Sequence, residues 1–301
     1  MYHDPVLLHQ SVEHLVINPD GIYVDCTFGG GGHSKEILNK LSEKGKLFAF
    51  DQDLDALENK IEDSRFTLIN QNFRFLENSM TMYGYPKVDG ILADLGVSSH
   101  QFDKLERGFS IRDSAPLDMR MNVLQPLDAK KILNSFEEEQ IADILYNYGE
   151  LREARKMART IVTKRAEKKI ETTADLKNLF SFIPAHKQNK VFAQIFQAIR
   201  IEVNQELEAL KEMLLQSYNI LKPEGRLAVI SYHSLEDRLV KRFLKNGMFE
   251  GEPARDIFGN FEKSFNLLQT KAIMPDELEI EKNSRARSAR MRIGIKVNKA
   301  K

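Results

Sequence analysis

The sequence predicts an α/β protein in which a mostly parallel sheet is interrupted by an all-helical insertion. Short apolar runs alternate with amphipathic segments over about the first 100 residues, which is typical of βαβ units around a parallel sheet. Helical patterns dominate from about residue 126 to residue 221, and strand patterns then return. We therefore expect a sheet domain in two parts, residues 1–105 and 196–301, with a loop and a helical insertion at residues 106–195.

The first part of the expected sheet contains four apolar runs, at residues 21–26, 46–51, 65–70 and 88–95. Residues 33–45 lie between the first two runs and carry apolar side chains on one helical face, with Gly45 as a stop signal. The alternation breaks at residues 96–122, a stretch rich in Phe, Leu and Met as well as in charge. A loop of this length that is not simply disordered is most often functional.

The later segments follow the same reasoning. Helices are expected at residues 126–148, 151–170, 173–183 and 189–221, and the last of them crosses the expected end of the insertion. Strands are expected at residues 222–232, 265–274 and 290–297. The chain thus returns to the sheet after its helical excursion.

Bulk composition excludes several classes of protein. Lysine plus arginine and aspartate plus glutamate both total 44, so no global field draws the chain to nucleic acid or to an acidic membrane. The single cysteine, Cys26, excludes a disulfide framework or a multi-cysteine zinc site. The first residues lack the apolar core of a signal peptide, and no stretch resembles a membrane span. We expect a cytoplasmic protein without a membrane or metal partner.

A run of four glycines follows the first expected strand, in the segment "FGGGGHS" at residues 28–34. Together with Asp25 it gives the spacing D-x-x-x-G-x-G, and Asp51 ends the second strand, where an acid can accept hydrogen bonds from both hydroxyls of a ribose. The run ends in Gly-His-Ser, whereas a phosphate-binding P-loop needs Gly-Lys-Ser/Thr. The turn therefore favours a nucleoside ligand that is not held by its phosphates.

Two nucleoside classes remain, a dinucleotide and S-adenosylmethionine. Ser34 stands near the position where a dinucleotide site usually has its third glycine. Asp25 would repel a pyrophosphate, whereas it suits the ammonium or sulfonium of the methyl donor. The sequence favours the methyl donor, while a capping or turn role for Asp25 stays open.

Two further positions follow strand ends. Phe73, just past the third strand, could flank an adenine or pack in the core. Asp94 ends the fourth strand, and ligands of open α/β sheets bind beyond the carboxyl ends of strands, near the point where strand order reverses. Both residues therefore join the candidate site.

Longer motifs extend over nearly the whole chain. They are "HDPVLL", "DCTFGGGGHS", "ILADLGVSS", "ERGFS", "PLDMRM", "FQAIRIEVNQEL", "SYHSLEDR" and "SRARSARMR". With these motifs the chain resembles the bacterial rRNA small subunit methyltransferase H family. The resemblance implies a class I S-adenosylmethionine-dependent, Rossmann-like fold with an inserted helical domain for substrate recognition. It further implies methylation of N4 of a cytidine in the decoding centre of 16S rRNA.

The resemblance also implies which residues contact the cofactor. Carried over position by position, the family's cofactor contacts fall on Gly31, Gly32, His33, Asp51, Phe73, Asp94 and Gln101. We keep Asp25 beside them as a candidate from its spacing alone.

The chemistry of the reaction suggests catalytic candidates. The exocyclic amine must be aligned, must lose a proton and must be stacked. Because "DLGVSS" lacks the Pro-Pro-aromatic sequence of many amino methyltransferases, we expect Asp94, or a carbonyl near Gly96, to orient the amine. Phe109 or His233 could stack the base. His233 could also be the general base or simply cap the helix that it precedes.

Three local basic segments could contact phosphate, although each could equally be a solvated face. They are a helical face (Arg152, Arg155, Lys156, Arg159), the C-terminal segment (Arg285, Arg287, Arg290, Arg292) and the long loop (Arg107, Arg112, Arg120). The loop could fold over a flipped base. A polar stripe of Gln197, Arg200 and Asn204 could serve either a domain contact or the substrate.

Two other functions stay open on sequence alone: a dinucleotide-dependent oxidoreductase and a non-catalytic RNA-binding assembly factor. Asp25 and Ser34 oppose the first, and the set of Asp25, Asp51 and Asp94 opposes the second. The oligomeric state is not predicted.

Overall fold

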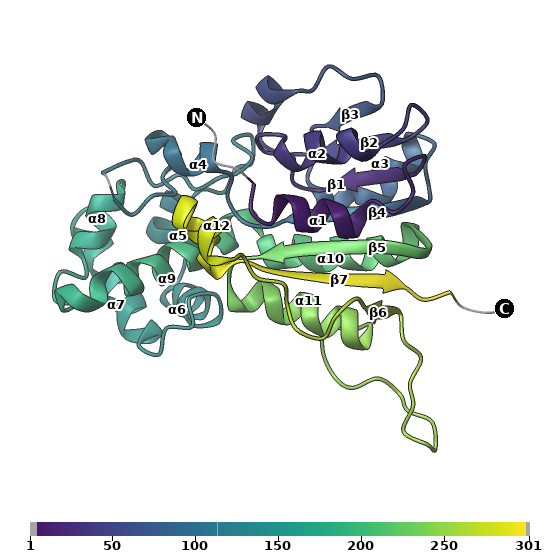
Figure 1. Ribbon diagram of the computed structural model, residues 1–301. Helices are drawn as coiled ribbons and strands as arrows, with labels where there is room; N and C mark the ends of the chain where they lie inside the picture. Colours follow the sequence, from purple (N-terminus) through teal and green to yellow (C-terminus); the bar gives the residue numbers. More distant parts are fainter. Residues whose placement is uncertain (1–4, 113, 299–301) are drawn as a thin grey trace. The chain divides into compact units, whose positions relative to one another are not determined.

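The computed structural model describes residues 5–112 and 114–298, which fall into two compact units (Figure 1). The first unit comprises Met1–Gly96 and Leu207–Lys301, and the second is Val97–Glu206. The second unit begins before, and ends after, the range 106–195 expected for the insertion.

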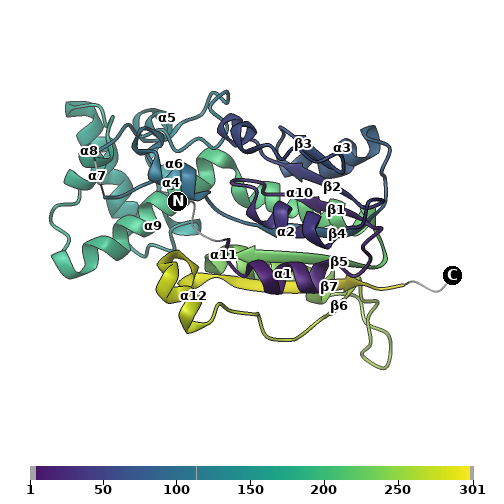
Figure 2. The ribbon, with the colours of Figure 1, turned by 45° about the horizontal axis from the view of Figure 1, so that its top comes forward.

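A seven-stranded sheet forms the centre of the first unit, in the order β3-β2-β1-β4-β5-β7-β6, and Figure 2 shows the strand labels in this order. The strands are β1 (Ile22–Asp25), β2 (Lys46–Phe50), β3 (Phe66–Ile69), β4 (Val88–Asp94), β5 (Leu221–Ser231), β6 (Phe265–Leu267) and β7 (Arg290–Lys296). The first five are parallel, whereas β7 is antiparallel to both β5 and β6. The predicted mostly parallel sheet is confirmed.

Alternating side chains of the strands enter two apolar clusters on opposite faces of the sheet. Val24 and Ile91 pack with the buried side chains of α3, α10 and α11, whereas Tyr23 and Leu92 pack with those of α1 and α2. Both faces are covered, which explains why these strands read as nearly continuous apolar runs in the sequence. The helices of this unit are α1 (Leu8–Leu15), α2 (Gly32–Lys40), α3 (Leu76–Met82), α10 (Glu206–Ile220), α11 (Ser234–Asn246) and α12 (Glu277–Lys282), with 3₁₀ turns η1 (Leu54–Asn59), η2 (Phe73–Phe75) and η4 (Ser284–Ser288).

The strand order reverses between β1 and β4. The chain runs outward from β1 to β3 on one side and from β4 to β5 on the other. Asp25 is the last residue of β1 and Asp94 the last of β4, so both carboxyl groups lie at this switch point. Open α/β sheets bind their ligands at this place.

The second unit is helical and is built around one apolar cluster that includes Leu117, Ile132, Leu145, Ile161 and Ile195. Its elements are α4 (Ser99–Asp103), η3 (Leu105–Arg107), α5 (Ala129–Ser135), α6 (Glu138–Asn147), α7 (Ala154–Glu167), α8 (Thr173–Asn178) and α9 (Ala185–Asn204). Among residues 5–112 and 114–298, no helix has the length and apolar character needed to cross a membrane.

Several predicted elements are divided or shorter in the structure: the helix expected over residues 126–148 is α5 and α6, and the strand expected over residues 265–274 is only β6. Two further helix ends show the reason most clearly. The helix expected over residues 189–221 is two helices, because Gln205 takes a left-handed backbone (φ 49°) that ends α9. The helix expected to stop at Gly45 ends at Lys40, because Leu41 is extended while its side chain is buried in the core. Both breaks depend on the backbone conformation of one residue, which hydrophobic periodicity does not report.

Candidate functional site

The glycine run forms the turn between β1 and α2. Gly29 and Gly31 have φ values of 51° and 76°, a left-handed region that favours glycine. At Gly32, the first residue of α2, a Cβ atom would lie 2.1 Å from Pro5 Cγ, so no side chain fits there. The bare backbone is thus required by the shape of the turn.

Asp25 is fully buried beneath this turn. Its carboxylate accepts hydrogen bonds from the backbone N–H of Thr27 (3.0 Å) and from Ser34 Oγ (2.7 Å). Burial raises the pKa of Asp25, although His33 and these hydrogen bonds act in the opposite direction. These contacts give Asp25 the turn role that the sequence left open. A contact between Asp25 and the cofactor stays a prediction.

Asp51 follows β2 and faces the same turn. Its Oδ2 accepts from the Gly29 N–H at 2.8 Å, and its Oδ1 accepts from the Asp53 N–H at 2.9 Å. Burial raises the pKa of Asp51 to about 6, against the lowering effect of these two hydrogen bonds. Each carboxylate oxygen has a second lone pair, so Asp51 can still accept from the two hydroxyls of a ribose.

Asp94 is held by contacts from three elements. Tyr232 donates its hydroxyl to Asp94 Oδ1 at 2.8 Å, His33 Nδ1 lies 3.9 Å from Oδ2, and the Asp94 N–H donates to Thr27 Oγ1 at 2.7 Å. The side chain is 21% exposed. Burial raises the pKa of Asp94 to about 6, opposed by His33 and by the Tyr232 hydrogen bond.

The orientation of His33 follows from its other ring nitrogen. Nε2 lies 3.1 Å from the carbonyl oxygen of Val6, which can only accept, so Nε2 carries a hydrogen. Nδ1 is therefore the nitrogen that faces Asp94, 3.9 Å from its Oδ2. His33 is 5% exposed and shields this side of Asp94 from water.

Tyr232 is a site residue that the sequence reasoning missed. Burial and the neighbouring Asp94 carboxylate raise the pKa of Tyr232 well above its ordinary value, so the hydroxyl keeps its proton and donates. The pairing of the strands would have indicated this residue. β4 and β5 are parallel neighbours in which Asp94 pairs with Ile230, two residues before Tyr232. Successive side chains of an extended chain alternate in direction, so only one of Tyr232 and His233 can point to Asp94.

His233 instead caps α11. The Glu236 N–H points to His233 Nδ1 at 3.4 Å, and the Glu236 side chain accepts from the His233 N–H, which completes a capping box. His233 Nε2 lies 3.1 Å from Glu236 Oε1, and the side chain is only 10% exposed. The structure thus shows the capping alternative for His233.

Phe73 begins η2 after β3. Its ring is half-buried and packs against the apolar cluster shared with α3 and α10. One side of the ring therefore belongs to the core, as the sequence allowed, and the exposed part leaves the adenine contact as a prediction.

The other two candidates lie in the second unit. Gln101 is 5% exposed and forms a capping box with Ser98 at the start of α4. Phe109 is 7% exposed and packs in the apolar cluster of the helical unit, with the Arg107 guanidinium 6.0 Å from its ring centroid. This placement does not favour the stacking role expected for Phe109, because a stacking ring must present its face to the base.

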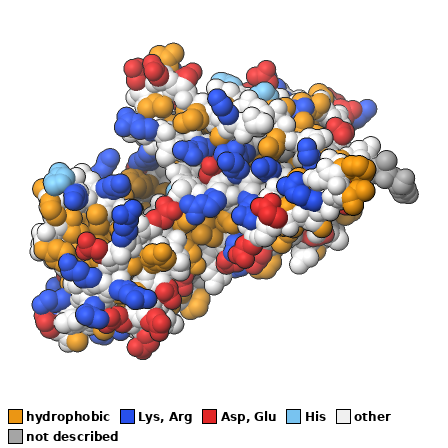
Figure 3. Space-filling model, turned by 90° about the horizontal axis from the view of Figure 1, so that it is seen from below, with side chains coloured by type: hydrophobic (Ala, Val, Ile, Leu, Met, Phe, Trp, Pro, Cys, Tyr) orange, Lys and Arg blue, Asp and Glu red, His pale blue; other side chains and the backbone are white. Residues whose placement is uncertain are grey.

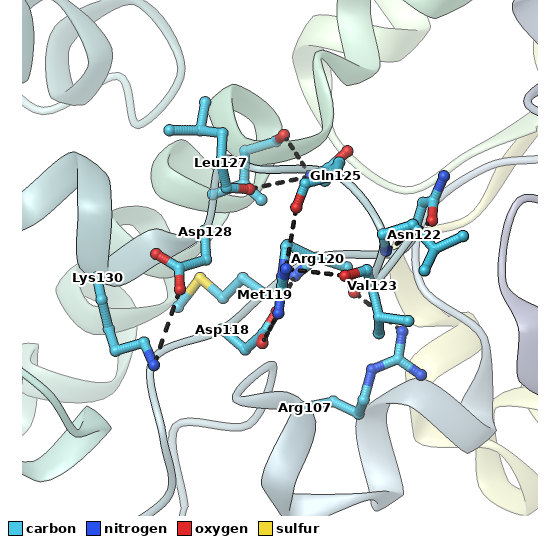
Figure 4. A network of polar contacts seen from close by, with 12 residues as sticks. Arg107, Asp118, Met119, Arg120, Asn122, Val123, Gln125, Leu127, Asp128 and Lys130 are labelled. Carbon is cyan, nitrogen blue, oxygen red and sulfur yellow. Dashed lines mark hydrogen bonds and ion pairs between the residues drawn. The ribbon is translucent and has the colours of Figure 1, made fainter.

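Two of the three loop arginines are used inside the loop itself (Figure 4). Arg107 is 6% exposed and donates to the carbonyl oxygens of Arg120 and Met121. Arg120 forms two 2.8 Å hydrogen bonds to Asp118 and also donates to the carbonyls of Val123 and Gln125. The expectation that all three contact phosphate is corrected, because two guanidinium groups fix the loop, while Arg112 is exposed.

The polar stripe on α9 makes contacts within the second unit. Gln197 donates to the Tyr148 carbonyl at 2.9 Å, and Arg200 pairs with Glu206 at 2.8 and 2.9 Å. Asn204 accepts from the Met121 N–H and donates to the Met119 carbonyl, both at 2.7 Å. The stripe therefore stabilises the helical unit and its long loop.

A glycine turn without phosphate-binding residues and acids at the ends of β1, β2 and β4 together define a Rossmann-like methyltransferase domain. The chain belongs to the MraW methylase family, whose model matches residues 1–297. This membership confirms the family resemblance, the methyltransferase class and S-adenosyl-L-methionine as the cofactor.

Curated relatives are similar over their whole length. The chain is 59% identical over 297 residues to a protein of Flavobacterium johnsoniae and 54% identical over 298 residues to one of Parabacteroides distasonis. Both are named ribosomal RNA small subunit methyltransferase H, and each match covers 98% of both chains. A solved rRNA methylase of Streptococcus thermophilus aligns with 96% of this chain and 94% of its own, at 12% identity and a TM-score of 0.38.

Proposed function

We propose that this chain methylates N4 of a cytidine in the decoding centre of 16S rRNA, in the bacterial cytoplasm. The names of the relatives support rRNA of the small subunit as the substrate. The observation that carries the chemistry is Asp94, a carboxylate at the switch point that is oriented by Tyr232 and remains partly exposed. An assembly factor that only binds RNA would not need such a group.

The donor set fits the cofactor. Asp51 would accept hydrogen bonds from the hydroxyls of the ribose, Gly31, Gly32 and His33 would contact the cofactor at the turn, and Phe73 would flank the adenine. Asp94 and Gln101 complete the expected contacts, and Asp25 acts by fixing the turn through Ser34. When bound, S-adenosyl-L-methionine supplies an electrophilic methyl group on a sulfonium.

Asp94 performs the step that the amine needs. Transfer of the methyl group to N4 would form the new N–C bond and release the donor as a neutral thioether with the electron pair of the broken C–S bond, which would leave the nitrogen one proton to lose. Asp94 accepts an N–H hydrogen bond from the amine, aligns its lone pair and takes that proton. The hydrogen bond from Tyr232 holds the carboxylate in place while this occurs, and His33 shields it from water.

Transfer of labelled methyl tests this proposal. The purified protein is incubated with labelled S-adenosyl-L-methionine and one of three substrates: a 16S rRNA transcript, 30S subunits or 70S ribosomes that lack the modification. Digestion to nucleosides should give labelled N4-methylcytidine from at least one substrate. Label in another nucleoside would contradict the target atom, and cofactor binding without transfer to any substrate would support an assembly factor.

A further inference from the structure

One face of α11 carries a line of cations. Arg238, Lys241 and Lys245 are exposed and Arg242 is partly buried, at the helical spacing i, i+3, i+4 and i+7. The opposite face packs in the core through Val240, Phe243 and Leu244. Residues at this spacing lie along one side of a helix, so the cations form a single stripe.

One further arginine, Arg290, extends this stripe, and Arg287 lies three residues before it in the chain. Arg287 in η4 and Arg290 in β7 are exposed, and the Arg290 guanidinium lies 3.4 Å from Asp237 in the first turn of α11. Arg292 is only 10% exposed and binds Asp237 at 2.6 Å, so it ties β7 to α11 and does not belong to the surface. Figure 3 shows many Lys and Arg side chains across the middle of the face seen from below.

The segment after α11 continues from the other end of the stripe. Phe249 stacks on Phe243 of α11 with ring centroids 5.2 Å apart, and Arg242 donates to the carbonyl oxygen of Gly251. Residues 256–260 then form a closed turn in which Asp256 Oδ1 accepts from the N–H groups of Phe258 (2.9 Å) and Asn260 (2.8 Å). The turn is therefore shaped by its own hydrogen bonds.

The tip of this turn presents two large apolar side chains to solvent. Ile257 is 92% exposed and Phe258 is 81% exposed. Arg255 donates to the Gly259 carbonyl at 2.8 Å and lies 5.3 Å from the Phe261 ring, which braces the turn from within. The turn follows the cationic helix in the chain and projects away from it (Figure 1), so helix and turn together offer cations and an exposed aromatic ring, the two components of a surface for single-stranded nucleic acid.

We propose that this α11 surface, made of Arg238, Lys241, Lys245, Arg287, Arg290 and Phe258, docks RNA. The cations contact backbone phosphates, and Phe258 stacks on an unpaired base. This inference rests on the proposed function, because it takes the RNA to be the rRNA substrate. An acidic protein partner would satisfy the cations but would give Phe258 no preference for an aromatic side chain over an aliphatic one.

The charge component is tested with the triple variant Arg238→Gln, Lys241→Gln and Lys245→Gln. Its matched control is Lys35→Gln, Lys40→Gln and Lys44→Gln, which removes three exposed cations of the same unit from α2 and the loop that follows it. Binding of each protein to a 16S rRNA transcript and to 30S subunits is measured over a series of KCl concentrations. Neutralising three phosphate contacts should lower the slope of log affinity against log salt by about 2 to 3.

The control variant should keep the slope of the unsubstituted protein, and the cofactor affinity of both variants should stay unchanged. A charge-preserving variant, Arg238→Lys, Lys241→Arg and Lys245→Arg, should restore the slope. A slope that falls equally in the test and control variants, or in neither, would overturn the charge component.

The stacking component is tested at Phe258. Phe258→Ala and Phe258→Leu should weaken binding of the transcript by about fivefold or more, whereas Phe258→Tyr should keep it, because only an aromatic ring stacks on a base. Equal affinity for the Leu and Tyr variants would overturn stacking.

These binding measurements do not depend on methyl transfer. If the unsubstituted protein methylates rRNA while the triple variant keeps its affinity and its salt dependence, the α11 surface does not dock RNA and the proposed function stands. If no rRNA is methylated, the proposed function fails, and the slopes still decide whether this surface binds RNA.

Discussion

Asp94 combines two properties that rarely occur together in a surface carboxylate. It is oriented by the hydroxyl of Tyr232, with His33 packed on its other side, and burial raises its pKa to about 6, so at neutral pH it is ionised but basic enough to accept a proton. A group of ordinary acidity would be a weaker base for the amine proton.

Asp94→Asn tests this role directly. The amide keeps the size of the side chain and an acceptor for Tyr232, but it cannot take a proton. The single-turnover rate of methyl transfer should fall by about 10²- to 10⁴-fold, the range expected for a lost general base. Cofactor affinity, measured by calorimetry, should change far less, and full turnover with normal cofactor affinity would contradict the assignment.

The pKa of Asp94 also predicts whether Asp94→Asn raises or lowers the stability of the fold. The pKa of Asp94 is higher in the folded chain than its ordinary value of 3.8, so the folded state favours the neutral form. The stabilising contribution of this group is complete below about pH 4 and is lost as the pH rises through about 6. The melting temperature of Asp94→Asn at pH 8 should therefore equal or exceed that of the unsubstituted protein.

Tyr232→Phe separates a positioning role from a purely structural one. The Tyr232 hydrogen bond lowers the pKa of Asp94, so its loss should raise that pKa further, by about one unit for a hydrogen bond to a charged group. The acid limb of the single-turnover rate against pH, expected near pH 6, should shift upward. An unshifted limb with a lower melting temperature would leave Tyr232 only structural.

The sequence could place the acids of this site but not their partners. Strand ends are readable from apolar runs, so Asp25, Asp51 and Asp94 could be found. The choice between Tyr232 and His233 depends on which side of an extended chain faces β4; the sequence named His233, with capping as one of its possible roles, and did not name Tyr232. The burial of Phe109, which does not favour its stacking role, depends on the packing of distant helices and could not be read from the sequence.

At the scale of elements, the seven strands were predictable because both faces of the sheet are covered. The helix breaks were not, since Gln205 and Leu41 adopt conformations that their residue types do not favour or signal. The loop arginines were misjudged for a related reason, because the partners of Arg107 are backbone carbonyls. A sequence pattern shows charge but not the geometry that satisfies it.

The start of α11 provides a prediction at this scale. Removing a helix cap costs about 0.5–2 kcal/mol, so His233→Ala should lower the free energy of unfolding by that amount, while His233→Asn, which can also cap, should lose little. Both variants should keep the single-turnover rate within about threefold, because the cap takes no proton from the amine. A loss of about 10²-fold or more in His233→Asn would instead restore the general-base role.

At the scale of the whole molecule, each unit has an apolar core of its own. The sheet unit contains two clusters and the helical unit one. The glycine turn, Asp51 and Asp94 all belong to the sheet unit. The two units can therefore respond differently to the cofactor, since a ligand stabilises the part of a chain that binds it.

Hydrogen exchange with and without the cofactor should resolve this difference. At about 100 times its Kd, a ligand adds about 2.7 kcal/mol to the stability of the state that binds it. Amides of β1, β4 and α2 should gain protection on addition of S-adenosyl-L-methionine, because they carry the turn and the acids that hold it. Amides in the core of α6 and α7 should gain less.

The Asp51→Asn variant, which loses one charged acceptor for the ribose, should need more cofactor for the same protection. Protection confined to the helical unit would contradict the cofactor site at the glycine turn.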